Sequence, residues 1–184
     1  MPTSPWRTAR SIPDLGRFMA LWLEGRAPQW PGYRAEFGHE EHADDVRRLV
    51  APLAVVNRAG LVTTQSQPAG DGPGADGARW RQRAFVSGVV RARSPLLARL
   101  PVLEREGLVV VVGRPPRPVV LTDRDGRPTL VLDTRRPGRD QLAREWAGTG
   151  RRALRELRRG TAVHVVDPVW GRNDRLWPAL ALLA

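Results

Sequence analysis

Three times along this chain, a helical pattern stops at a glycine and a β-type run follows at once. The glycines are Gly60, Gly107 and Gly160, and the runs that follow are Leu61 to Gln65, Leu108 to Val112 and Thr161 to Val166. Glycine favours the backbone conformation that closes a helix C-terminus, so each step predicts a helix followed directly by a strand. This alternation favours an α+β fold in which helices flank a mixed β-sheet.

Other patterns add elements to this fold. Helices are predicted for residues 11–25, about 40–59, 95–106, 141–146, 152–159 and 176–183, and further strands for residues 80–90, 119–122 and 129–133. The run from Ala69 to Gly77 holds four glycines and predicts a flexible loop. A chain of 184 residues suits one core. We therefore expect a single domain over 1–184, with a helical part at 1–60 and a mixed α/β part at 61–184.

Composition excludes several chemistries. The chain has no cysteine, which removes thiolate catalysis, disulfides and cysteine metal sites. No apolar run approaches the roughly 20 residues that span a bilayer, and no export signal is apparent, so we expect a cytoplasmic protein without a membrane partner. The segment from His39 to Asp45 lacks the spacing of a zinc protease site, and we interpret it as an acidic helix start rather than a metal site.

The most distinctive stretch runs from Asn57 to Pro68, with the sequence Asn-Arg-Ala-Gly-Leu-Val-Thr-Thr-Gln-Ser-Gln-Pro. Beyond the glycine-rich run it is followed by Gln-Arg-Ala-Phe at residues 82–85. Polar side chains where a chain leaves a sheet commonly contact ligands. Two interpretations are open: Thr63 and Thr64 serve a ligand site, or they are strand formers that precede a turn.

This stretch resembles the C-terminal regulatory domain of eukaryotic-type methylenetetrahydrofolate reductase, the domain that binds S-adenosylmethionine. The similarity continues in order through the helix and strand at residues 95–112, Val-Val-Asp-Pro-Val at residues 165–169 and Leu176-Trp177. The catalytic barrel of that reductase has no counterpart here. The opening pattern over Trp6 to Gly25 also resembles an uncharacterised family of stand-alone actinomycete proteins. The first resemblance implies a stand-alone domain that binds S-adenosylmethionine, S-adenosylhomocysteine or a related nucleoside.

The resemblance also implies where a ligand would bind. Thr63 and Ser66 match hydroxyl residues of that domain, Asp45 lies where it has a glutamate, and His164 where it has a threonine. Independently of the family, a nucleoside-like ligand needs polar groups beside an apolar wall, which a strand end next to a helix supplies. We predict a small-molecule site lined by Asp45, Thr63, Ser66, Gln82 and His164.

An alternative hypothesis is a small enzyme that acts on a related ligand, with Asp45 and His164 as an acid–base pair. The simpler interpretation of His164, which lies within an apolar strand, is a buried histidine with structural hydrogen bonds.

A third hypothesis follows from charge. The formal net charge is +11, and every one of the 30 basic residues is arginine, which is typical of a GC-rich genome. The helix near residue 155 carries a basic face opposite Ala153, Leu154 and Leu157, formed by Arg151, Arg152, Arg155, Arg158 and Arg159. Such a face predicts nucleic-acid binding, although arginine near a helix C-terminus is also favoured by the helix dipole.

Overall fold

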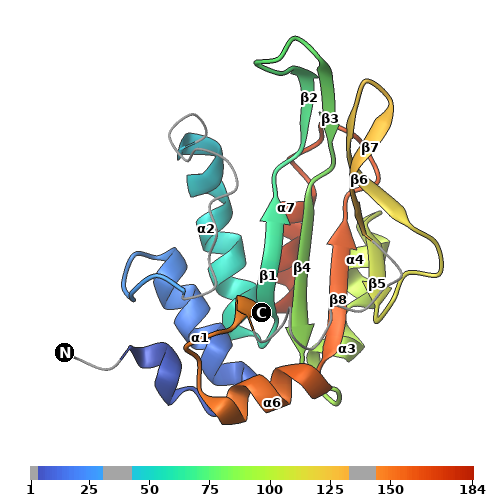
Figure 1. The fold of residues 1–184 in the computed structure, drawn as a ribbon. Helices are drawn as coiled ribbons and strands as arrows, with labels where there is room; N and C mark the ends of the chain where they lie inside the picture. The colour runs from blue at the N-terminus through green and yellow to red at the C-terminus, as the bar shows by residue number, and fades with distance from the viewer. Residues whose placement is uncertain (1–3, 31–42, 133–143) are drawn as a thin grey trace.

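Two antiparallel sheets organise the molecule (Figure 1). The computed structural model describes residues 4–30, 43–132 and 144–184, with the backbone alone at residues 43–47. Sheet A has the strand order β1 (Val62–Gln67), β4 (Phe85–Val90), β8 (Thr161–Val166) and β5 (Val109–Val112). Sheet B has the order β2 (Gly70–Pro73), β3 (Arg79–Gln82), β6 (Val119–Arg124) and β7 (Arg127–Leu132). The α+β class and single domain are confirmed, with antiparallel pairing in both sheets where a mixed sheet was expected.

Helices cover both faces of sheet A. They are η1 (Pro5–Thr8), α1 (Ile12–Leu23), α2 (Ala43–Arg58), α3 (Leu96–Arg99), α4 (Pro101–Arg105), α6 (Arg151–Arg159), α7 (Leu176–Leu180) and η2 (Ala181–Leu183). The predicted start of α1 is confirmed, since the Ser11 hydroxyl accepts a hydrogen bond from the Asp14 amide over 3.2 Å. In the parts of the chain that the structure describes, no helix is long and apolar enough to cross a membrane.

The three helix-to-strand steps exist, but their glycines serve two purposes. Gly60 and Gly107 adopt φ angles of 103° and 75°, the left-handed conformation expected at a helix end. Gly160 has a φ of −69°, which any residue adopts. A Cβ at Gly160 would lie 2.4 Å from Val89 Cγ1, so this glycine provides room for α6 to reach β4.

The predicted loop at residues 69–77 is wrong for its first half, because Gly70–Pro73 forms β2 and pairs with β3. Glycine and aspartate are poor strand formers, so the sequence gives no β signal, and the pairing with β3 imposes the extended form. The predicted strand at residues 80–90 is two strands. β3 belongs to sheet B and β4 to sheet A, and the chain passes from one sheet to the other at Arg83 and Ala84.

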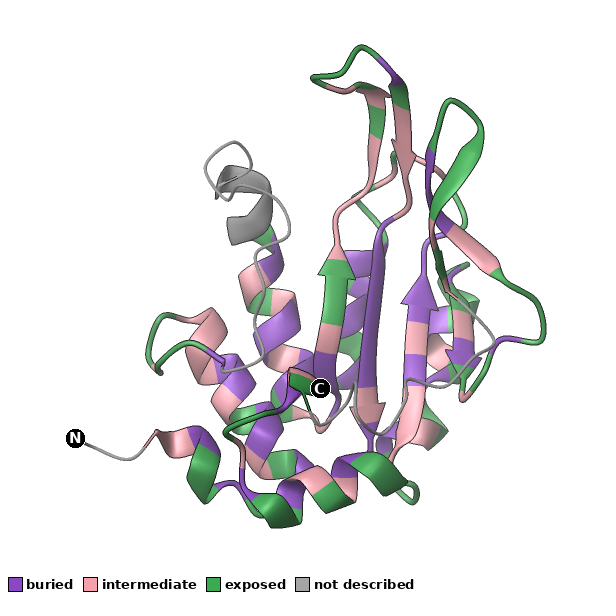
Figure 2. Cartoon of the chain, viewed as in Figure 1, coloured by how far each residue is buried: buried purple, intermediate pink, exposed green. Residues whose placement is uncertain are grey.

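The core has three parts. On one face of sheet A, residues of α2, α3, α4 and α7 pack against Val86, Val163 and Val165. On the other face, η1, α1 and α6 pack around Val62 and Trp146. A small cluster of Phe85, Leu121 and Val166 joins the two sheets. Figure 2 shows β4 buried along most of its length, while the far ends of sheet B are exposed.

Candidate functional site

Thr63, a predicted ligand residue, is committed to the buried side chain of Asn57. The Asn57 amide nitrogen donates to the Thr63 hydroxyl over 2.8 Å and to the Leu53 carbonyl over 2.8 Å. The Thr63 backbone N–H in turn donates to the Asn57 side-chain oxygen over 3.0 Å. Both residues are buried, so these bonds fasten the end of α2 to the start of β1.

The Ser-Gln-Pro part of the motif also holds the fold together. The Gln67 amide nitrogen donates to the carbonyls of Arg83 and Leu121 and to the Thr122 hydroxyl, over 3.0, 3.3 and 3.1 Å. Gln67 therefore ties sheet A to sheet B where the chain crosses between them. Gln82, a predicted ligand residue, likewise donates to the Pro68 carbonyl over 3.0 Å.

The strand register decides which predicted residues share a face. Thr63 pairs with Gly88 and Ser66 with Val86, which places both on the α2 side of sheet A, and Ser66 is exposed there. His164 pairs with Ser87, one residue out of step, so its side chain lies on the opposite face. The structure brings Thr63 and Ser66 to one face and does not bring His164 to them. The side chain of Asp45, the remaining candidate and the proposed partner of His164 in catalysis, lies outside the described residues.

His164, which is half-buried, forms a pair with the buried Ser87. The Ser87 hydroxyl lies 2.8 Å from His164 Nδ1, and Ser87 is 3% exposed. Burial lowers the pKa of His164 from its usual 6.5, while a hydrogen bond to the backbone of Gly113 acts in the opposite direction. The imidazole is therefore neutral at neutral pH, which agrees with the structural interpretation of this histidine.

The predicted arginine face of α6 is exposed. All five arginines, Arg151, Arg152, Arg155, Arg158 and Arg159, are exposed to solvent, while Ala153 and Leu157 are buried. At about 100° per residue the five side chains fall within about 120° of the helix circumference. Among the described residues, none of the five forms an ion pair.

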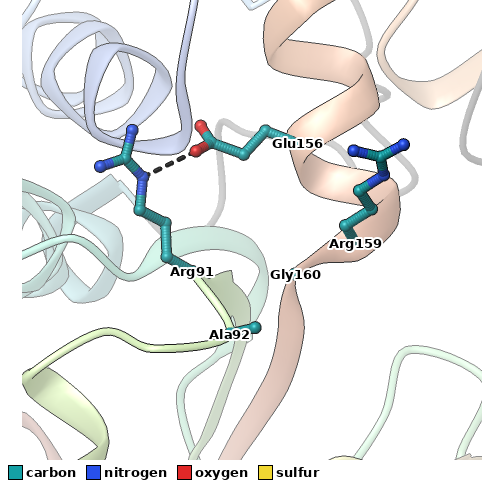
Figure 3. Close-up of a pocket in the computed structure, with 5 residues that line it drawn as sticks. All are labelled: Arg91, Ala92, Glu156, Arg159 and Gly160. Atoms are coloured by element: carbon teal, nitrogen blue, oxygen red, sulfur yellow. Dashed lines mark ion pairs between the residues drawn. The ribbon is translucent and has the colours of Figure 1, made fainter.

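The single acidic residue of α6 is engaged elsewhere. Glu156 accepts from Arg91 Nε over 2.7 Å and from the Ile12 backbone N–H over 2.5 Å. Arg91, Glu156 and Arg159 line an open hollow of about 470 Å³. Figure 3 shows the ion pair on one side of it and Arg159 on the other. Glu156 thus fixes α6 against α1, and within the described parts of the chain no carboxylate neutralises the arginine face.

A second basic cluster was not predicted. Trp170, in the loop after β8, lies under two guanidinium groups, with Arg83 Cζ 4.2 Å and Arg81 Cζ 5.0 Å from its ring centroid. A signal was present in the sequence, because arginines at residues 79, 81 and 83 alternate along a predicted strand and so face one side. Nothing in the sequence indicated that Trp170 would meet them.

Comparison with known proteins gives one result. A family model described as a domain of unknown function, DUF6919, matches residues 2–183. The chain belongs to the DUF6919 family. No curated protein matches it. The resemblance to the reductase regulatory domain stays a prediction, and in this DUF6919 domain Asn57, Thr63 and Gln67, three residues that carry it, make structural hydrogen bonds.

Proposed function

We propose that this DUF6919 domain binds a polyanion of the nucleic-acid class through the arginine face of α6. The observation that carries the proposal is the crowding of like charge. Arg155 has an arginine at each of the helix positions i−4, i−3, i+3 and i+4. Like charges at such spacings destabilise a helix by about 0.2–0.5 kcal/mol per pair, and phosphates along the face would remove that repulsion.

The helix dipole does not account for the arrangement. Arg158 and Arg159 lie in the last turn, where the dipole favours cations, but Arg151 and Arg152 lie in the first turn, where it disfavours them. The N-cap residue Gly150 makes no side-chain capping bond. The first-turn N–H groups are therefore suited to donate hydrogen bonds to a phosphate oxygen, together with the two arginines.

The chemistry of the face favours nucleic acid over a membrane or a protein partner. Its side chains are guanidinium groups, whose planar donors match phosphate oxygens in pairs. The apolar residues of α6 face the core, so the exposed side offers no Trp, Leu or Phe to anchor in lipid or in a protein pocket. Contacts between guanidinium groups and phosphates recognise the nucleic-acid backbone and not the base sequence.

The test is a triple variant with Arg151, Arg155 and Arg158 replaced by Gln, which is nearly as good a helix former as arginine. Binding to a double-stranded DNA oligonucleotide is measured over a series of salt concentrations. If each arginine neutralises one phosphate, the plot of log K against log salt becomes shallower by about 3 and binding weakens at every salt concentration.

The matched control replaces Arg105, Arg114 and Arg117 by Gln. These arginines are exposed, lie outside α6, and their loss changes the net charge by the same amount. The control should bind DNA almost as the unaltered protein does. Equal weakening by both variants would contradict the proposal, as would unaltered protein that fails to bind DNA at low salt. Tighter binding to polyglutamate than to DNA would assign the face to an acidic protein instead.

A further inference from the structure

The Arg83 guanidinium carries a partly buried charge that no carboxylate neutralises in the described parts of the chain. Its Nη1 donates to the Val120 carbonyl over 3.1 Å, and its Nε is buried without a hydrogen-bond partner. One face of the group is covered by the Trp170 ring. We propose that Arg83, together with Arg81 and Trp170, forms a binding site for a small oxyanion, either a phosphate or a carboxylate group of a small molecule.

The carboxylates nearest to Arg83 are occupied by other arginines. Asp123 accepts two hydrogen bonds from Arg81, over 3.3 and 2.5 Å. Asp167, which is fully buried, accepts two from Arg172, over 2.7 and 2.6 Å. Each pair uses both carboxylate oxygens, so neither acid is free to turn toward Arg83.

The surroundings of Arg83 disfavour its positive charge. Burial and the neighbouring charge of Arg81 lower the pKa of Arg83 below its usual value, although the group stays protonated. A buried charge without a partner destabilises a fold, and the Trp170 ring compensates only in part. A bound oxyanion would supply the missing negative charge and accept the guanidinium hydrogens that no protein group uses.

The cluster adjoins a hollow on its Arg81 side. The hollow has a volume of about 280 Å³ and is lined by Arg79, Arg81, Asp123, Asp125 and Gly126, and not by Arg83 or Trp170. The exposed sides of Trp170 and Arg81 border the solvent, so an anion could reach Arg83 from there. The cluster lies at the sheet B end of the molecule, whereas α6 lies at the opposite end (Figure 1), so the two basic sites are separate.

The test observes the Arg83 Nε–H group directly by nitrogen–hydrogen NMR of the full chain. Because Nε is buried, its proton should exchange slowly and give a visible resonance. The resonance that disappears in Arg83→Lys identifies it, and this variant keeps the positive charge. Inorganic phosphate and acetate are each added against sodium chloride at matched ionic strength.

We expect at least one of the two anions to shift the Arg83 resonance in a saturable manner, and the stronger one names the oxyanion class. The same anion should raise the melting temperature of the unaltered protein and of Arg117→Gln more than that of Arg83→Lys, whose ammonium group cannot make paired hydrogen bonds. If neither anion shifts the Arg83 resonance, the proposal is overturned. A rise in melting temperature that is equal in all three proteins does not rescue it, because phosphate stabilises proteins in general by exclusion from their surfaces. The result is independent of α6, because none of the altered residues lies there.

Discussion

Replacing Asn57 by alanine should destabilise the fold more than any removal of one hydroxyl in the same motif. The substitution leaves the Thr63 N–H and the Thr63 hydroxyl without their partners in a buried place. An unsatisfied buried polar group costs about 1–3 kcal/mol, so two of them amount to about 2–6 kcal/mol. Domains of this kind are stable by about 5–15 kcal/mol in total, so the loss would be a large share.

The matched comparison is Thr63→Val, which removes the hydroxyl and keeps the backbone N–H bonded to Asn57. The Asn57 amide still donates to the Leu53 carbonyl, but its second N–H loses its buried acceptor, so the expected cost is that of one unsatisfied polar group, about 1–3 kcal/mol. Urea denaturation followed by circular dichroism gives both free energies of unfolding. If Asn57→Ala costs no more than Thr63→Val, these hydrogen bonds do not fasten α2 to β1.

Two further predictions concern packing and pH. Gly88→Ala places a Cβ 2.5 Å from the Val62 carbonyl oxygen and should destabilise the fold by about 1–3 kcal/mol. The control Gly72→Ala, whose Cβ has nothing within 4 Å, should be neutral or slightly stabilising. Equal urea midpoints for the two variants would show that the close approach of β1 to β4 does not require a glycine at residue 88. Since burial lowers the pKa of His164, the unfolded chain binds the proton more tightly. Stability should therefore fall as pH drops below 6.5, by at most about 1.4 kcal/mol per pH unit. His164→Gln should remove this part of the pH dependence, and unfolding curves of equal pH dependence in both proteins would contradict a neutral, half-buried imidazole.

The sequence was informative where local chemistry decides the structure. Ser11 caps α1, and Gly60 and Gly107 close helices, as the residues predict. Prediction from the sequence failed where residues far apart in the chain determine the structure. The strand β2 consists of Gly-Asp-Gly-Pro and is extended only because it pairs with β3, which in turn pairs with β6.

The candidate ligand site shows why side-chain direction was harder to predict than the strands. Simple alternation would put Thr63 and Ser66 on opposite faces of β1, three residues apart. A register shift between Thr63 and Gln65 brings them to the same face. His164 is one residue out of step with them across β4, and no property of the strand β8 alone reveals its register.

Arginine content alone says little about where this protein is positively charged, because the partner of each arginine decides its net effect. Arg58, Arg79, Arg81, Arg91, Arg124 and Arg172 each form an ion pair with a carboxylate. Genome composition can supply arginines throughout a chain, but it does not place five of them at mutually repelling positions on one exposed helix face. It also does not place a half-buried Arg83 near two carboxylates that are both paired with other arginines. The arginines best placed to bind an anion are therefore those that no carboxylate neutralises in the described parts of the chain.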